Sequence, residues 1–477
     1  MSGFIEGESR YQTTLFPEAL DEYIQEDNPV RVIDVFVDDL DLAVLGFKTE
    51  PADTGRPAYH PGVMLKLFIY GYLNRVQSAR RLEREAGRNV ELMWLIGRLA
   101  PDFKTIADFR RGNTQGITRV CREFVLLCRK LDLFADSLIA IDGSKFKAVN
   151  NRNRNFTPAK IKHRMKQIDE SIARYLGQMA SADRIDLATA SLKKERLSEK
   201  VGKLRQEVKY LNQMQQTLQQ HPDGQVSLTD PDARSMATSG RGTGMVGYNV
   251  QAAVDSKHHL ILAHEVTNEG HDRTQLAKMA LQAQAILDAE EITVVADRGY
   301  YSGEEIKTCE EAGIETYVAK PQTSGNQSKG YFGKRDFKYH PEEDEYECPA
   351  GERAIYRFTR EENGKRIRRY WSSACRHCPL KPRCTTGKER RISRWEHEPI
   401  LDELEARVER NPDMMKVRRS TAEHPFGTIK FWMGSTHFQM KTIKRVSAEM
   451  SLHVLAYNLR RVINILGTKQ LIEAIQS

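Results

Sequence analysis

Two short apolar segments that each end in an aspartate constrain the fold of this chain more than any other feature. SLIAID covers residues 137–142, and ITVVAD covers residues 292–297. Such runs are typical of strands buried on both faces of a sheet. If the two strands are parallel neighbours, Asp142 and Asp297 emerge at the same sheet edge. Two carboxylates so placed either share a proton or bind a divalent cation such as Mg²⁺ or Mn²⁺, whereas a single aspartate can simply cap a turn.

The segments around these strands predict an α/β core with a mixed sheet. Residues 247–255 and 260–267 carry strand signals and are close enough in sequence to form an antiparallel pair, and a helical pattern begins at Asp272. A second helix is expected over residues 302–313 and a further strand over 314–320. Strand, hairpin, helix, strand, helix and strand in this order are typical of an α/β domain.

A third carboxylate, Glu423, lies in a segment whose other charges are basic. Asn411 and Pro412 predict a helix start, as N-cap and first helical residue. Along that helix Arg419, Glu423 and Lys430 would lie nearly on one face, although a proline at 425 should kink or end the helix. The simpler alternative is an ion pair between Arg419 and Glu423, worth about 0.3 to 0.5 kcal/mol.

Two further regions have helical patterns. Residues 1–130 predict an all-helical domain, in which Ser78 is an expected N-cap and Cys121 and Cys128 are expected core residues. Residues 159–227 predict two helices with a heptad-like seam, formed by Ile161, Met165, Ile168, Ile172, Leu197, Val201, Leu204, Val208 and Leu211. The seam fits an antiparallel hairpin within the chain, and a dimeric coiled coil remains the alternative.

Positive charge is concentrated locally. The 477-residue chain, long enough for two to four domains, has a formal net charge of +8. No acidic residue occurs from Gly143 to Gln167, a stretch that can follow a polyanion or be a solvated basic loop. The candidate DNA contacts in it are Lys145, Lys147, Arg152 and Arg154.

Four of the seven cysteines lie close together in the sequence. Cys348 is followed by CRHCPLKPRC, which contains Cys375, Cys378 and Cys384. This pattern, in a strand-rich region punctuated by prolines, predicts a four-thiolate structural zinc site. An iron–sulfur cluster or free thiols are the alternatives, and His377 and His397 are possible substitute ligands. The surrounding arginines, lysines and tryptophans indicate a basic module that touches DNA.

The sequence shows neither a signal-peptide pattern nor a long apolar segment. The first sixteen residues contain no basic segment followed by an apolar run, so we expect no signal peptide. No window approaches ~18 uninterrupted apolar residues. The expectation is a soluble cytoplasmic protein without membrane contact.

These motifs together resemble one family. Asp142 after a first strand, Asp297 in ADRGY and Glu423 within R-x3-E-x6-K resemble the DDE triad of bacterial insertion-sequence transposases. YHPGVMLKLFIYGYLNRVQSARRLE and PDFKTIADFR are similar to the InsH-type N-terminal domain of those proteins, and DPDARSM with GYNVQ also resembles them. The similarity extends over nearly the whole chain and is greatest to insertion-sequence family 1182. One departure is Lys416, where the related signature often has a tyrosine.

The resemblance implies an activity and a site. The core would be RNase H-like, and Asp142, Asp297 and Glu423 would bind two Mg²⁺ (or Mn²⁺) ions. Arg419 and Lys430, joined by Arg298 after the second aspartate, would contact the DNA backbone. The enzyme would bind terminal inverted repeats, hydrolyse phosphodiester bonds at the element ends and transfer the 3′-OH ends to target DNA. It would work as a homodimer or larger oligomer on the bacterial nucleoid. A metal-dependent nuclease and a non-catalytic DNA-binding descendant remain alternatives.

The sequence patterns and the family resemblance together divide the chain into several expected parts. The expected parts are a helical domain for DNA-end binding or dimerisation (1–130), RNase H-like core segments (131–158 and 228–321), an inserted helical hairpin (159–227), an inserted Cys-rich, zinc-ribbon-like module (322–400), and the glutamate helix with C-terminal helices that complete the core (401–477).

Overall fold

The centre of the molecule is a mixed six-stranded sheet. The computed structural model describes residues 19–50, 57–134, 137–150, 154–182, 187–221, 223–237, 244–321, 325 and 329–477. The strand order is β4-β5-β1-β7-β8, and β6 also pairs with β5. The strands are β1 (Leu138–Lys147), β4 (Arg234–Met236), β5 (Met245–Asp255), β6 (Ile261–Thr267), β7 (Ile292–Ala296) and β8 (Ile314–Val318).

The pairing of β1 confirms the predicted mixed sheet. β1 is antiparallel to β5 and parallel to β7, with Ile141 opposite Ala296. The sequence had suggested that this strand ends at Asp142, and that expectation is wrong. β1 continues to Lys147 because it pairs with β5. The apolar run marked only the part of β1 that is buried on both faces, and the polar remainder is held by the β5 ladder.

Helices cover both faces of the sheet. Ile139 and Ile141 share the main core with α9 (Leu276–Leu287), whereas Ala140 packs in a second cluster with Ala422 of α12 (Met414–Gly427). Because side chains alternate along a strand, α9 and α12 lie on opposite faces. Two further helices, α10 (Gly303–Glu311) and α11 (Glu398–Arg410), pack against β8.

Two helix starts differ from prediction. α9 begins at Leu276 rather than at Asp272. α12 begins at Met414 with Asp413 as N-cap, because Asn411 ends the preceding helix α11 (Glu398–Arg410) as its C-cap and donates a hydrogen bond to the Arg407 carbonyl. Pro412 therefore lies in the turn between the helices, where its missing N–H costs nothing.

The N-terminal helices share a core with the C-terminal helices. α13 (Ile443–Leu466) packs against α2, α6 and β6, and α14 (Thr468–Gln476) packs against α1. Cys121 and Cys128 are buried in this core, and Ser78 is the N-cap of α3, as predicted. The N-terminal helices are α1 (Pro29–Asp39), α2 (Pro61–Leu73), α3 (Ala79–Ala86), α4 (Val90–Leu95), α5 (Phe103–Gly112) and α6 (Thr114–Lys130).

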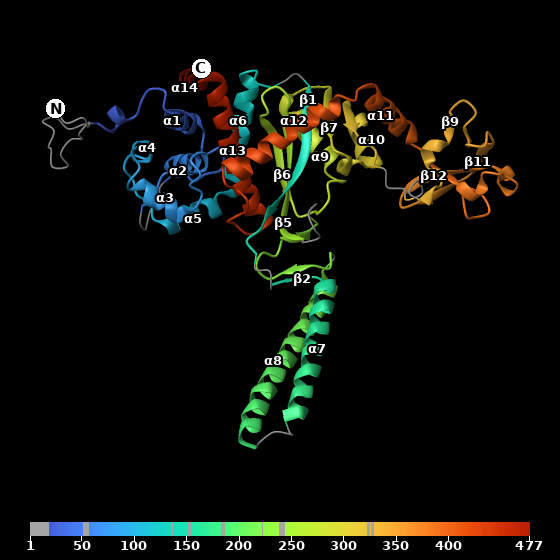
Figure 1. The fold of residues 1–477 in the computed structure, drawn as a ribbon. Helices are drawn as coiled ribbons and strands as arrows, with labels where there is room; N and C mark the ends of the chain where they lie inside the picture. Colours follow the sequence, from blue (N-terminus) through green and yellow to red (C-terminus); the bar gives the residue numbers. More distant parts are fainter. Residues whose placement is uncertain are drawn as a thin grey trace, which may run out of the picture.

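A helical hairpin projects from the body as a stalk (Figure 1). α7 (Pro158–Ala182) and α8 (Leu187–Gln220) pack against each other within the chain, around their own apolar cluster. β2 (Asn155–Phe156) and β3 (Val226–Ser227) pair at its base. The basic stretch 143–167 is therefore not a loop, since most of its described residues belong to β1, β2 and α7.

The Cys-rich segment forms a second, antiparallel sheet. It lies at the opposite end of the molecule from the N-terminal helices (Figure 1), with the order β13-β12-β11-β10-β9. The strands are β9 (Lys338–His340), β10 (Glu345–Glu347), β11 (Arg353–Glu362), β12 (Lys365–Trp371) and β13 (Ile392–Trp395).

In the described ranges no helix is both long and apolar enough to cross a bilayer.

Candidate active site

The two strand aspartates are neighbours in space. The parallel register of β1 and β7 ends with Ile141 opposite Ala296, so Asp142 and Asp297 are the next residues on adjacent strands. Asp142 accepts a hydrogen bond from the Gly143 N–H at 2.9 Å, and Asp297 accepts one from the Gly299 N–H at 2.7 Å. These contacts fix both carboxylates at one edge of the sheet.

α12 brings the third carboxylate to the same edge. Ala422 is fully buried in a cluster with Ala140 of β1 and Val295 of β7. The small side chains at 140 and 422 let the helix approach the sheet closely, and Glu423 follows directly. The glutamate side chain remains 58% exposed, so it borders the cluster from the solvent side.

A single guanidinium lies among the three carboxylates. Arg418 contacts Asp142 at 3.0 Å, Glu423 at 3.5 Å and Asp297 at 4.0 Å. The ion pair of Glu423 is therefore with Arg418, and not with Arg419 as the simple helix-pair alternative had it. Arg419 is exposed. The reason is the rotation of α12 on the sheet, because neighbouring residues of a helix point ~100° apart.

The acidic residues differ in their electrostatic surroundings. Burial raises the pKa of Asp142 to about 6, partly opposed by the Arg418 charge and assisted by the charge of Asp297. The Asp142 side chain is only 16% exposed, against 42% for Asp297. Asp142 is thus the carboxylate that most needs a cation beside it to remain ionised.

A fourth carboxylate, Asp272, supports the site from behind. Its Oδ1 accepts hydrogen bonds from Asn249 Nδ2 at 2.7 Å and Gln251 Nε2 at 2.8 Å. The buried Tyr300 hydroxyl donates to Gln251 Oε1. A Cβ at Gly143 would lie 2.5 Å from the Gln251 amide nitrogen and 2.7 Å from Asp272 Oδ1, so a larger residue here would force these hydrogen-bonded side chains to shift. The network thereby fixes the β1 backbone next to Asp142.

The donor set fits a divalent metal ion by its chemistry. Asp142, Asp297 and Glu423 offer only carboxylate oxygens, and two of them are open to solvent, which suits Mg²⁺ or Mn²⁺. Among the described residues, no group of three or more His, Cys, Asp or Glu side chains is already spaced as a metal site. Instead, the carboxylates are held around Arg418.

Comparison with known proteins identifies the family. The family described as "Transposase DDE domain" matches residues 216–459, just over half of the chain. The chain belongs to this family. It is a DDE transposase, an enzyme that cuts DNA and transfers strands. A second family, "Transposase domain (DUF772)", matches residues 18–112, which confirms the resemblance to insertion-sequence transposases.

No curated protein matches the transposase. A solved structure titled "Cryo-EM structure of piggyBac transposase synaptic complex with hairpin DNA" is similar over 94% of this chain and 79% of that chain, with 7% sequence identity and a TM-score of 0.32.

Lys430 of the transposase turns toward the protein rather than toward solvent. It lies in the π-helix η8 (Thr428–Trp432), which continues α12 beyond Pro425. Its ammonium donates to Ser144 Oγ at 2.6 Å and the Lys145 carbonyl at 2.9 Å, and burial lowers its pKa. The lysine therefore ties the end of α12 to β1, two residues beyond Asp142.

The other candidate DNA contacts of the transposase divide by exposure. Lys145 is half-buried and donates to the Ala237 carbonyl. Arg152 lies outside the described residues. The exposed candidates are Lys147, Arg154, Arg298 and Arg419.

The four clustered cysteines of the transposase line one small cavity of about 30 Å³, close to the ends of β10 and β12. Burial raises the pKa of Cys384, and the charges of Cys375, Cys348 and Cys378 act in the same direction. The fold thus brings Cys348 to the three later cysteines, the first of which is 27 residues further along the chain, as the zinc prediction requires. The sulfur atoms are not at the spacing of metal ligands.

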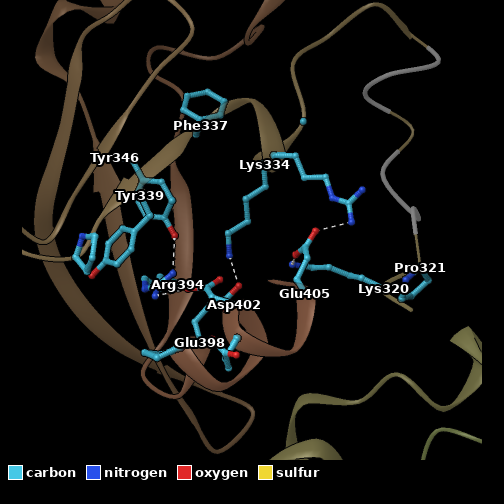
Figure 2. Close-up of a pocket in the computed structure, with 15 residues that line it drawn as sticks. Lys320, Pro321, Lys334, Phe337, Tyr339, Tyr346, Arg394, Glu398, Asp402 and Glu405 are labelled. Carbon is cyan, nitrogen blue, oxygen red and sulfur yellow. Dashed lines mark hydrogen bonds and ion pairs between the residues drawn. The ribbon is translucent and has the colours of Figure 1, made fainter. Parts of the chain in front are cut away.

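A cavity of about 950 Å³ lies between α11 and the antiparallel sheet, and none of the carboxylates described above lines it. Figure 2 shows ion pairs along its wall. Lys334 pairs with Glu398 at 2.6 Å, and Glu405 pairs with Lys320 at 3.0 Å. The first pair ties the segment before β9 to α11, and the second ties α11 to the chain just after β8.

Sequence reasoning missed Arg418, Asp272 and Gln251 in this transposase. Arg418 adjoins Arg419, and only the orientation of α12 distinguishes them. Asp272 was treated as a helix start, and the sequence carried no signal that it faces Gly143. Gln251 could have been found from its position, because it is a polar residue within an otherwise largely apolar strand. A polar side chain buried there needs hydrogen-bond partners.

Proposed function

We propose that the transposase binds the terminal inverted repeats of its element, hydrolyses a phosphodiester bond at each end and joins the freed 3′-OH ends to target DNA. In this proposal Asp142, Asp297 and Glu423 bind two Mg²⁺ or Mn²⁺ ions. The observation that carries it is the convergence of three carboxylates, from β1, β7 and α12, within 3.0 to 4.0 Å of one guanidinium.

The sheet supports an RNase H-like core. Three strands, β6, β5 and β1, run antiparallel, and β7 and β8 continue parallel to β1. In this arrangement β1 and β7 are central neighbours. Their aspartates therefore share one edge, as two-metal phosphoryl chemistry needs.

Each residue has a role in this proposal. The carboxylates orient the ions, which when bound supply the activated water and the charge neutralisation at the scissile phosphate. Asp272, with Gln251, positions the β1 backbone beside Asp142. The exposed Arg298 and Arg419 contact phosphates, with Lys147 and Arg154 extending the contact along β1 toward the hairpin. The working form is an oligomer that holds both element ends.

The proposal is tested by Glu423→Gln, which keeps the shape of the side chain and removes its charge. Cleavage and strand transfer are measured on labelled DNA carrying the element ends, with Mg²⁺. We expect both to fall about 100-fold or more while DNA binding persists. The exposed Glu409 of α11 provides the control, Glu409→Gln. Normal cutting by Glu423→Gln would remove the glutamate from the triad, and cutting without joining by the wild type would favour the nuclease alternative.

We further propose a structural zinc ion at Cys348, Cys375, Cys378 and Cys384. Their common cavity supports this site, and four thiolates are a usual zinc donor set. The double variant Cys375→Ser/Cys378→Ser should lose bound zinc, measured by atomic absorption on the purified protein. The variant His377→Gln/His397→Gln should retain it. Zinc-free wild-type protein, or an iron absorption band, would refute the assignment.

A further inference from the structure

Arg418 occupies the centre of the carboxylate cluster. Its Nη2 contacts Asp142 and Asp297, and its Nη1 contacts Glu423. The arginine side chain is 15% exposed, so the guanidinium lies inside the cluster rather than over its rim. The cation thus touches an oxygen of every carboxylate that a metal ion would use.

Most contacts of Arg418 with the carboxylates are long, so little holds the guanidinium in this position. Only the pair with Asp142, at 3.0 Å, is within hydrogen-bond distance, and the other two are 3.5 and 4.0 Å long. Arg418 Nε is buried without a hydrogen-bond partner among the described residues. By comparison, the buried Arg407 makes three hydrogen bonds, two to Glu310 and one to the Thr316 carbonyl.

We propose that Arg418 is an internal cation that holds the triad together in the metal-free transposase and competes with the divalent ions for the same oxygens. The inference rests on the proposed function, because it takes these three carboxylates as metal ligands. Like charges at this distance repel, and one fixed positive charge among them relieves the repulsion. Since arginine stays protonated at all relevant pH values, metal loading requires the side chain to move.

This competition predicts a gain in metal affinity when the guanidinium is removed. The probe is Mn²⁺ alone, titrated into the full chain and followed by the electron paramagnetic resonance signal of free Mn²⁺. Arg418→Gln should bind Mn²⁺ about 5-fold or more tightly than the wild type. Lys416→Gln, which removes one exposed positive charge from the same helix, should leave the affinity unchanged.

Stability gives an independent measurement. In EDTA, Arg418→Gln should melt below the wild type because its carboxylates repel, and Mn²⁺ should raise its melting temperature by more than it raises that of the wild type. If this variant does not fold, Arg418→Lys keeps a charge that reaches fewer carboxylates, and its Mn²⁺ affinity should still exceed that of the wild type.

The outcomes separate this inference from the function it rests on. If Asp142→Asn abolishes Mn²⁺ binding while the Arg418 variants bind Mn²⁺ like the wild type or more weakly, the competition is refuted and the metal site stands. If neither the wild type nor Arg418→Gln binds Mn²⁺, the metal site itself fails and the inference falls with it.

Discussion

At the scale of single residues, the candidate active site depends on small side chains beside its carboxylates. Ala422 allows α12 to lie against Ala140, and Gly143 leaves room for the Gln251 amide and the Asp272 carboxylate. Ala422 precedes Glu423, and Gly143 follows Asp142. The positions of the carboxylates thus depend on small neighbouring side chains as well as on the hydrogen bonds that the carboxylates accept.

Gly143→Ala should therefore disturb the site although the new side chain is one methyl group. Its Cβ would lie 2.5 Å from Gln251 Nε2, and overpacking of this kind costs about 1 to 3 kcal/mol. We expect a lower free energy of unfolding in urea and reduced DNA cleavage. Gly202→Ala, at a position in α8 with open space around it, is the matched control and should be neutral or stabilising. An unchanged Gly143→Ala protein would contradict the Asp272–Gln251 network.

At the scale of elements, the α7–α8 hairpin is structurally separate from the sheet. Its apolar cluster contains residues of the hairpin and of the short β2–β3 pair, and none of the central strands. Phe156 pairs with Val226 where the hairpin leaves the body. The heptad seam was readable in the sequence for the same reason, because it is satisfied within one contiguous segment.

Replacing residues 158–224 by Asn-Gly should therefore leave the body folded. The dipeptide would close β2 and β3 with a two-residue turn suited to antiparallel strands. We expect the circular dichroism signal to lose helix while the main melting transition stays in place. Ile168→Asp in the full chain, which opens the hairpin core, should also leave that transition unchanged. Loss of the main transition in either protein would show that the hairpin supports the body.

At the scale of the whole molecule, α13 joins the N-terminal helices to the sheet. It contacts α2 and α6 as well as β6. Two histidines lie in this region, His453, which is fully buried, and His264, which is half-buried. His264 of β6 is 3.0 Å from Ser451 Oγ, and His453 is 2.9 Å from Ser435 Oγ. Burial lowers the pKa of His264 to about 4 and that of His453 to about 3. Both imidazoles are therefore neutral in the fold.

This burial predicts the direction of acid sensitivity. Below pH 6.5 the unfolded chain binds a proton at each histidine, whereas the folded protein does not until about pH 4 or lower. Stability should fall with decreasing pH across that window, by about 1.4 kcal/mol per pH unit for each histidine at full effect. Urea unfolding of His264→Gln/His453→Gln should show a shallower pH slope than the wild type. Equal slopes would contradict the prediction.

The sequence by itself determined the local features of this protein. Apolar runs and helical spacing are satisfied by neighbours along the chain, so strands, helices, the hairpin and the three carboxylates Asp142, Asp297 and Glu423 could be named in advance. The site roles of those carboxylates remain proposals. Element ends were less readable, because the length of β1 depends on its partner β5 and the start of α12 depends on where α11 ends.

Only the tertiary structure decided which side chains meet. Arg418 and Arg419 are equivalent in sequence, and the close contact of Ala422 with Ala140 and Val295 turns one into the cluster and the other to solvent. Asp272 approaches Gly143 only because helix α9 and strands β1 and β5 pack in one body. These relations join residues more than a hundred positions apart, and local periodicity carries no information about such distances.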